Sequence, residues 1–352
     1  MTQTLDKEYK TPAEIAEEQL KMKSLKKDTD KLFGKYLADD TINEIVANGN
    51  GTIFIEDIHG NWIEDKENFN KITYKEKKSF TKALTSFNKI PEADKTNPSI
   101  DATLHTGERV NVTIPPQEPD NQISITIRKP SKTRYTLDDY IERGSLSLET
   151  AQFLQNAVRE GRNLVICGET GSGKTTFMKT LIDFIPSSER IITIEDTSEI
   201  IFYNHRNVDQ LFYPSDAKMG DKRTAATCLK ACLRKKPDRI LLAELRGAET
   251  FDFLNVITSG HNGTITSCHA GSVKECYFRL VMMSMQNPQA QACGRDLIME
   301  IVKRVIDVVV VFKRELTPDN KKVRRIVEML YDGKIYKRQE NGDFIDAQFT
   351  EI

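Results

Sequence analysis

The 352 residues carry 51 Lys and Arg against 52 Asp and Glu, which gives a formal net charge of −1, and 38% of them are hydrophobic. A chain of this length accommodates two domains of roughly 150 residues each. Its near-neutral charge argues against nucleic acid as the main partner, because phosphate backbones are bound through accumulated Lys and Arg, so we expect no direct sequence-specific nucleic-acid binding.

Residues 1–30 are crowded with Lys, Glu and Asp, which is unlike a signal peptide. Ile15, Met22 and Leu25 form one weak apolar stripe at helical spacing. The interleaved charges of both signs favour a flexible segment, either a frayed, solvated helix or a tail, and contact with a membrane surface stays open. No later run approaches the roughly 18 uninterrupted apolar residues of a membrane span.

Residues 31–129 predict a smaller α+β domain. Thr41-Ile42-Asn43-Glu44 has the pattern of a capping box and predicts a short helix. Two β-rich runs around a polar turn, at 52–55 and 61–63, predict a hairpin. We expect a further helix over 75–87 and strands over 99–104, 109–114 and 123–127.

Arg109 and Arg128 stand at the ends of two of these strands, where a guanidinium can reach a phosphate. Spacing alone favours solvated strand-end arginines. Residues 130–148 have little apolar content at their start and two capped helical starts, at Thr136 and Ser147, and we interpret them as a linker to a domain at 149–352.

The second domain contains a phosphate-binding pattern, G-x-x-x-x-G-K-[ST], between a short apolar strand at 163–167 and a helical pattern over 176–184. Glycines let phosphates approach the backbone, N–H groups and the helix N-terminus bind the oxygens, and Lys174 adds a cation at the β/γ-phosphates. The Thr175 hydroxyl would hold Mg²⁺. The motif therefore predicts a bound nucleoside triphosphate, with contacts from Gly168, Glu169, Thr170, Gly171, Ser172, Gly173, Lys174, Thr175 and Thr176.

Beyond this loop, β-rich runs alternate with helical patterns, which predicts a mostly parallel sheet covered by helices on both sides. We expect strands at 190–194, 240–242, 263–267 and 308–312. Ligands bind at the carboxyl ends of such strands. The first three are followed by polar residues suited to phosphate chemistry, namely Glu195, Asp196 and Glu199, then Glu244, then His269.

Hydrolysis requires a positioned water, a group that orients or deprotonates it, a metal and positive charge on the transition state. Glu195, Glu199 and Glu244 are the available carboxylates, and the residues alone do not rank them as the base. Glu244 could hold the water shell of the metal, polarise the attacking water, or only cap the helix that follows. Arg234 and Arg246 bracket the 240–242 strand, where they could complete a site across a subunit boundary or form intrachain salt bridges.

His261, Cys268 and His269 are residue types that bind metals, but no further ligand pair lies at suitable spacing. We expect His269 instead to sense the γ-phosphate by hydrogen bonding. The chain contains no C-x-x-C pair, and its cysteines read as reduced, packed thiols of a cytosolic protein. They are Cys167, Cys228, Cys232, Cys268, Cys276 and Cys293.

Four segments in this order, 168–176, 194–199, 241–247 and 260–270, resemble the traffic ATPases shared by type II secretion, type IV pili and type IV secretion. Ala-Glu-Leu-Arg-Gly at 243–247 and Thr-Ser-Cys-His-Ala-Gly-Ser at 266–272 resemble the type IV secretion branch. The first half matches less sharply, through 107–110 with Pro115-Pro116 and through 127–130. The tetracysteine element of some type II relatives is absent from the sequence.

The resemblance implies a homo-hexameric ring in which an N-terminal domain is joined to a RecA-like domain with ATP and Mg²⁺ between them. It also assigns roles to individual side chains. Glu195, Asp196 and Glu199 would form the acidic box, with Glu199 favoured for activating water, Glu244 would be the second-motif glutamate, His269 the histidine box, Arg109 and Arg128 nucleotide contacts, and Arg234 and Arg246 charges supplied in trans.

Members of this family lie in the cytoplasm, on or near the inner membrane, and work with a second ATPase and inner-membrane proteins. The resemblance thus implies an ATPase motor whose domain closure drives substrate transfer or pilus assembly. A nucleic-acid motor shares the RecA-like core, but the sequence has no evident basic or aromatic channel. A GTP switch would need a guanine-reading Asn-Lys-x-Asp motif, which is absent, whereas a ring that binds nucleotide without hydrolysing it stays open.

Overall fold

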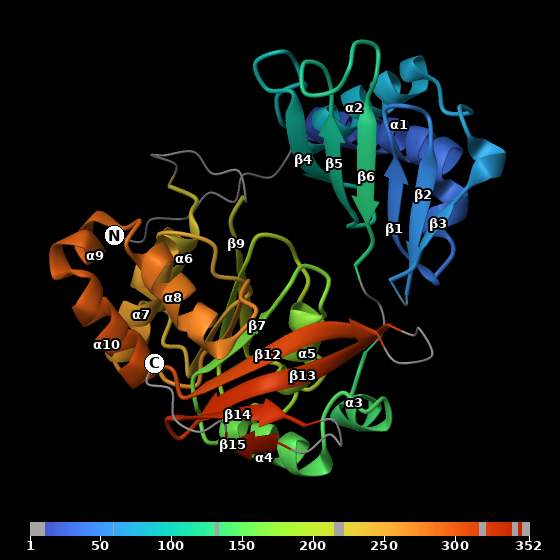
Figure 1. Cartoon of the computed structure of the whole chain (residues 1–352). Helices are drawn as coiled ribbons and strands as arrows, with labels where there is room; N and C mark the ends of the chain where they lie inside the picture. Colours follow the sequence, from blue (N-terminus) through green and yellow to red (C-terminus); the bar gives the residue numbers. More distant parts are fainter. Residues whose placement is uncertain are drawn as a thin grey trace, which may run out of the picture. The chain divides into compact units, whose positions relative to one another are not determined.

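The computed structural model describes residues 11–58, 60–130, 134–214, 222–316, 322–339 and 344–346. Contacts divide the chain into two compact units, Met1–Lys132 and Thr133–Ile352, each with its own sheet (Figure 1). Within the part of the chain that the structure describes, no helix combines the length and the apolar character needed to cross a membrane.

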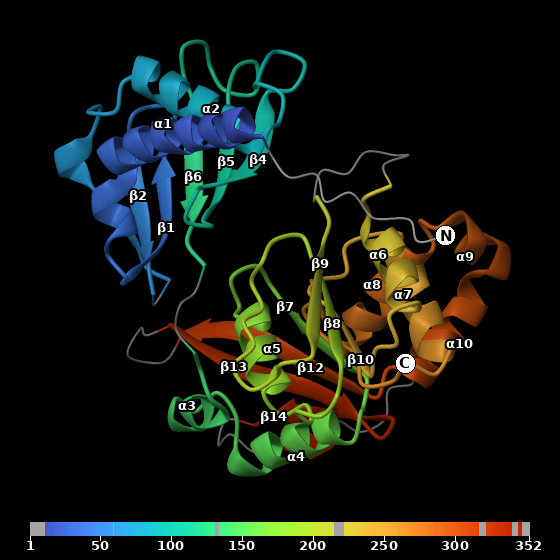
Figure 2. The ribbon, with the colours of Figure 1, turned by 180° about the vertical axis from the view of Figure 1, so that it is seen from behind.

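The first unit is a six-stranded antiparallel sheet in the order β3-β2-β1-β6-β5-β4, with two helices on one of its faces (Figure 2). Side chains from both helices and from alternate strand positions form one core, which includes Phe33, Phe80 and Ile127. The elements are α1 (Pro12–Leu37), β1 (Ile42–Ala47), β2 (Ile53–Asp57), β3 (Trp62–Glu64), a 3₁₀ turn at Lys66–Asn68, α2 (Tyr74–Asn88), β4 (Ser99–Thr103), β5 (Arg109–Thr113) and β6 (Ser124–Arg128).

The predicted hairpin, the helix over 75–87 and the three later strands are all present in this unit. The helix predicted from 41–44 is wrong, because these residues begin β1. Ile42 and Ile45 are buried there between neighbouring strands. Tertiary burial of β-branched side chains thus overrides the local capping pattern, and the Thr41 hydroxyl instead donates to Asp39.

The segment predicted to be flexible contains the start of α1. Thr11 caps the helix through a capping box with Glu14. Ile15 and Met22 are each 44% exposed, as a solvated helix would leave them, but Leu25 is fully buried in the core of the first unit. The interleaved charges therefore correctly indicate that the first half of α1 is exposed, but they give no sign that its second half packs into the core.

The second unit has a nine-stranded sheet in the order β15-β14-β13-β12-β7-β11-β10-β8-β9. The strands from β12 to β9 pair in parallel, as predicted, and β13 to β15 extend the sheet with antiparallel pairs. The strands are β7 (Leu164–Gly168), β8 (Ile191–Glu195), β9 (Val208–Phe212), β10 (Arg239–Leu242), β11 (Ile265–Cys268), β12 (Val308–Leu316), β13 (Lys322–Tyr331), β14 (Lys334–Arg338) and β15 (Phe344–Asp346).

Helices cover both faces of this sheet, and each face has its own core. Along β7, Leu164 and Ile166 pack into one core, whereas Val165 and Cys167 pack into the other. A strand buried on both faces needs a continuous apolar run, which is why 163–167 lacks alternation. The first face carries α3 (Leu137–Glu142), α4 (Leu148–Arg159) and α5 (Lys174–Ile182), and the second α6 (Ala225–Cys232), α7 (Glu249–Thr258), α8 (Val273–Ser284), α9 (Pro288–Cys293) and α10 (Arg295–Val305).

Residues 134–148 are part of the second unit and not a free linker. Leu137 and Tyr140 of α3 are buried, and the Tyr140 ring lies 5.0 Å from the ring of Phe177 in an edge-on contact. The capping signals at Thr136 and Ser147 were correct, because both residues cap the helices that follow them. The low apolar content at 130–133 gave no sign that a packed helix begins at Leu137.

Candidate active site

The phosphate-binding loop connects the end of β7 to the start of α5, as its sequence predicts. A Cβ on Gly168 would lie 2.4 Å from the carbonyl oxygen of Phe312, so only glycine fits there. Gly173 has φ +97° and precedes α5 without a side-chain cap. The first N–H groups of α5 are therefore available to an anion, and the buried Ser172 hydroxyl, which has no hydrogen-bond partner within the described structure, adds a donor.

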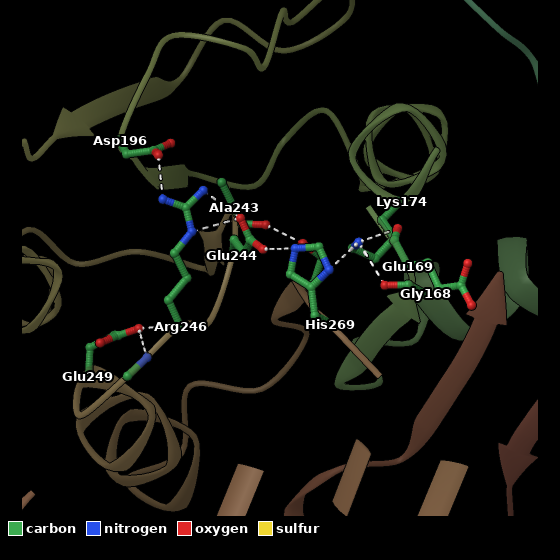
Figure 3. Close-up of polar contacts among 11 residues, drawn as sticks. Gly168, Glu169, Lys174, Asp196, Ala243, Glu244, Arg246, Glu249 and His269 are labelled. Carbon is green, nitrogen blue, oxygen red and sulfur yellow. Dashed lines mark hydrogen bonds and ion pairs between the residues drawn. The ribbon is translucent and has the colours of Figure 1, made fainter. Parts of the chain in front are cut away.

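Lys174 lies folded back onto its own loop (Figure 3). Its ammonium donates to the carbonyl oxygens of Gly168 at 2.8 Å and Glu169 at 2.9 Å, and it lies 3.3 Å from Nδ1 of His269. Through these contacts the ammonium lies at the phosphate-binding loop, where it can meet the charge of a bound phosphate. The loop thus holds the lysine in place beside the histidine.

His269 continues this contact into a chain of polar side chains at the carboxyl edge of the sheet (Figure 3). Its Nε2 lies 2.8 Å from Glu244, and Glu244 accepts from Arg246 at 2.6 Å. Arg246 also donates to Asp196 at 2.7 Å. A neutral imidazole protonated at Nε2 satisfies both contacts of His269, since Lys174 donates to Nδ1 and Nε2–H donates to Glu244.

Arg246 forms intrachain salt bridges, one of the two alternatives that the sequence left open. Burial lowers the pKa of its guanidinium, but Asp196 and Glu244 more than offset this, and the net pKa is raised above its ordinary value. The arginine therefore stays charged and fixes the two carboxylates. Glu244 does not cap the following helix, because α7 starts without a side-chain cap hydrogen bond. Glu249 instead accepts from the backbone N–H groups of Arg246 and Gly247 just before the helix.

The three candidate glutamates lie in different environments. Glu195 is fully buried and accepts four hydrogen bonds, from the Thr193 hydroxyl, the Gln210 amide and the backbone N–H groups of Glu199 and Ile200. Such a carboxylate shapes the turn after β8 and has little freedom to take a proton from water. Glu199 is half-buried on that same turn, and Glu244 is fixed by its ion pairs.

Arg109 and Arg128 lie directly opposite each other on β5 and β6 of the first unit. They alternate with the core residues Val110 and Ile127, so they share the face that α1 and α2 leave uncovered. Glu44 faces Arg128 from β1; burial raises the pKa of Glu44, and Arg128 only partly offsets this. Two arginines in register are mutually repulsive, which suits them to an anionic ligand.

Arg234 is exposed between the end of α6 and the start of β10. This is the amino edge of the parallel sheet, whereas the phosphate-binding loop, Glu244 and His269 follow strand carboxyl ends. Arg234 is therefore separated from the site of its own chain. His261 lies before β11, at the same amino edge, and so apart from His269.

Two arginines that the sequence analysis missed lie at the phosphate-binding loop. Arg314 of β12 donates to the carbonyl oxygen of Gly171 at 3.0 Å, and a Cβ on Gly173 would lie 3.0 Å from Cδ of Arg324. The two arginines face each other across the β12–β13 pair. The strand expected at 308–312 stops short of Arg314, whereas β12 continues to Leu316.

The residues of this site fit a nucleoside triphosphate bound with Mg²⁺. The loop offers glycines, a helix N-terminus and a lysine for phosphate oxygens, and half-buried Thr175 stands at the second position of α5, as a metal-binding hydroxyl requires. Glu244 has both oxygens occupied by His269 and Arg246, so it suits the water shell of a metal better than direct coordination.

Comparisons with known proteins agree with this site. The model of the family "Type II/IV secretion system protein" matches residues 26–343. The type IV secretion system protein VirB11 of Brucella abortus is 42% identical over 299 residues, covering 78% of this chain and 82% of VirB11. The type IV secretion system protein PtlH of Bordetella pertussis is 35% identical over 321 residues, covering 84% of this chain and 92% of PtlH.

Among solved structures, the Legionella pneumophila ATPase DotB matches with a TM-score of 0.58 and 21% identity, over 95% of this chain and 83% of DotB. This likeness shows a shared two-domain fold with a RecA-like second domain. The family match and the extent of the VirB11 and PtlH matches show more than fold. The chain belongs to the type II/IV secretion system protein family and is a type IV secretion ATPase.

Proposed function

We propose that this protein is a hexameric motor that hydrolyses ATP with Mg²⁺ and energises type IV secretion, by substrate transfer, pilus assembly or both. The observation that supports this most is the continuous chain Lys174–His269–Glu244–Arg246–Asp196, which joins the phosphate-binding loop to the acidic box. A nucleotide that changes one end of this chain changes the partners of every other member.

ATP draws Lys174 away from the Gly168 and Glu169 carbonyls and toward the β/γ-phosphates. His269 then loses the donor to Nδ1 and can turn that nitrogen toward the γ-phosphate if it carries a proton there. Thr175 holds Mg²⁺, which neutralises phosphate charge when bound. The mechanical step is closure of the first unit over the second, and hydrolysis releases it.

Among the carboxylates, we propose Glu199 as the residue that orients or deprotonates the attacking water. Glu195 is committed to four hydrogen bonds, and Glu244 is held by Arg246 and His269. Glu199 lies on the turn that Glu195 fixes, at the carboxyl edge of the sheet. We assign Glu244 the second role of holding the metal's water shell.

Positive charge comes from three places in this proposal. Arg314 and Arg324 supply it in cis, beside the loop. Arg109 and Arg128 supply it from the first unit when that unit closes, and their mutual repulsion favours an anion between them. Arg234 supplies it in trans to the neighbouring protomer, since it is exposed at the opposite edge of its own sheet.

We also propose that the ring works in the cytoplasm beside the inner membrane, with a second ATPase and inner-membrane proteins as partners. The exposed first half of α1 is the segment we propose for peripheral membrane contact.

The decisive experiment measures ATPase rate per protomer over a wide range of protein concentration, with Lys174→Ala as the blank. A specific activity that rises and then levels off supports sites completed by neighbours. A flat activity well above the blank, even at dilutions that dissociate the ring, contradicts the trans contribution of Arg234. Activity equal to the blank at every concentration, with partner proteins and membranes also added, contradicts the motor itself.

A further inference from the structure

Three cysteine side chains from separate elements meet inside the second unit. Cys167 ends the apolar run of β7, Cys268 ends β11, and Cys276 lies in the first turns of α8. The sulfur of Cys268 lies 3.4 Å from that of Cys167 and 3.8 Å from that of Cys276, and all three sulfurs lie within 4.8 Å of one another. All three are free thiols with 0% exposure.

These sulfurs lie directly beneath the catalytic edge. Cys167 and Cys268 are register partners on adjacent strands, and each is the last residue before a functional one, Gly168 and His269 respectively. Anything that binds the sulfurs therefore acts one peptide unit from the carbonyl that holds Lys174 and from the histidine that contacts it.

The chemistry of the cluster suits a soft metal ion. The thiolate is the form of cysteine that binds metals. Each of the three thiols would therefore give up its proton when an ion enters.

The spacing also fits a metal. Three sulfurs at about 2.3 Å from one ion lie roughly 3.8–4.0 Å apart. The 3.8 Å between Cys268 and Cys276 fits this value, and the 3.4 Å between Cys268 and Cys167 needs only a small expansion. His269 does not supply a fourth ligand, because its ring nitrogens contact Lys174 and Glu244. Structural zinc sites almost always have four ligands. Soft thiolate ligands also select Cu⁺, which can be coordinated by three sulfur ligands.

We propose that Cys167, Cys268 and Cys276 form a three-sulfur site for a soft d¹⁰ cation, with Cu⁺ preferred over Zn²⁺, and that its occupancy inhibits ATP hydrolysis. Three metal–sulfur bonds form on binding, the three S–H bonds break, and the three protons leave to solvent, with no change of oxidation state. The ion ties the ends of β7 and β11 to α8 and thereby restrains Gly168 and His269.

The ordinary alternative is that these are packed core thiols, since free cysteine is among the most buried residue types. The two readings differ in what the intact protein binds. The test is an anaerobic titration of the metal-free full-length protein with Cu⁺ against a competing chelator, followed by X-ray absorption at the copper edge. Matched variants are Cys276→Ala, which removes one proposed ligand, and Cys293→Ala, which removes an exposed thiol outside the cluster.

We expect one Cu⁺ per protomer with three sulfur neighbours at about 2.3 Å, at least a tenfold weaker affinity in Cys276→Ala, and unchanged binding in Cys293→Ala. ATPase activity of the wild type falls in proportion to loading. Equal Cu⁺ binding by the two variants, or fewer than three sulfur neighbours in the wild type, overturns the site. The absorption result needs no variant, so it decides the question even if Cys276→Ala does not fold.

A parallel titration with Zn²⁺ tests the choice of ion. Tighter Zn²⁺ binding through the same three cysteines supports the site and overturns the preference for Cu⁺. Stoichiometric Cu⁺ binding without loss of ATPase activity overturns the inhibition. Because binding is measured directly, these outcomes stand apart from whether the motor proposal holds.

Discussion

Lys174 and His269 are 95 positions apart in the chain, and yet the lysine ammonium lies 3.3 Å from Nδ1 of the imidazole. The contact joins the phosphate-binding loop to the residue that directly follows β11. Both residues contact a further partner, the lysine its own loop and the histidine Glu244. In the proposed function, nucleotide binding at the lysine would therefore change the surroundings of the histidine.

Lys174→Ala is expected to reduce ATP turnover by at least about a hundredfold while leaving the fold intact, because the lysine supplies the charge at the β/γ-phosphates. The measurement is steady-state ATPase rate alongside thermal unfolding. Lys230→Ala, which changes an exposed side chain of α6, is the matched control and should retain full activity. Near-normal hydrolysis by Lys174→Ala would remove the central assignment.

His269→Gln and Glu244→Gln are each expected to lower kcat by roughly ten- to a hundredfold, since residues of one hydrogen-bonded chain act as a unit. The double variant should lose little more than the worse single variant, because the second change acts on a chain already broken. The measurement is a double-mutant cycle on kcat. Fully multiplicative losses would show that the two residues act independently.

Arg234→Ala and Arg246→Ala are expected to differ in mixed rings. Arg246 holds carboxylates of its own chain, so mixing Arg246→Ala with Lys174→Ala protomers should restore no activity beyond what the Arg246→Ala protomers show alone. Arg234→Ala protomers mixed with Lys174→Ala protomers should recover part of the wild-type ATPase activity. At some protomer boundaries an intact Arg234 then lies beside a site with an intact Lys174. The same behaviour in both mixtures would contradict the distinction.

Arg314→Ala is expected to weaken nucleotide affinity about five- to tenfold, because a guanidinium beside the loop attracts phosphate. The adjacent Lys313→Ala removes a charge from the opposite face of the same strand, and it should change affinity less than twofold. Fluorescent nucleotide titration measures both. An equal loss in the two variants would indicate a diffuse charge effect instead of a placed contact.

Lys77 predicts a pH dependence of stability in the first unit. Its ammonium donates to the backbone carbonyls of Ala47, Asn48 and Ile123. Burial lowers the pKa of Lys77 to about 8, which Glu118 only partly offsets. Between pH 8 and the ordinary value of 10.5 the unfolded chain binds more protons than the folded one, so the free energy of unfolding contributed by Lys77 rises with pH, by on the order of 3 kcal/mol.

Denaturant unfolding at several pH values in that window checks this dependence. The slope of stability against pH should be smaller in Lys77→Met than in the wild type, and the exposed neighbour Lys78→Met should keep the wild-type slope. Identical slopes in all three proteins would contradict a depressed pKa at Lys77.

The sequence predicted the parts of this site that local patterns determine. Gly168 and Lys174 form a loop whose chemistry depends on consecutive residues, and Glu244 and His269 follow short apolar strands whose carboxyl ends must share an edge. It could not show that Glu195 accepts four hydrogen bonds or that Arg246 forms an ion pair with Asp196. These contacts depend on how the chain folds after β8 and on a partner that is distant in sequence.

Two errors, one in each unit, have the same cause. Thr41 to Glu44 has the local pattern of a helix start, but the surrounding strands bury Ile42 and Ile45 in a sheet. Arg314 was missed because nothing in its own neighbourhood indicates the loop, which is 143 residues away. Long-range pairing decided both, and a single sequence carries no direct signal of pairing.

The order of the strands in the sheet sets the order in which the polar side chains contact one another. Lys174, His269, Glu244 and Asp196 follow β7, β11, β10 and β8, which are successive neighbours in the sheet although not in the sequence. Three strand spacings of about 4.8 Å span roughly 14 Å. In the proposed function, a nucleotide at the phosphate-binding loop would therefore act on these side chains across the sheet, at right angles to its strands.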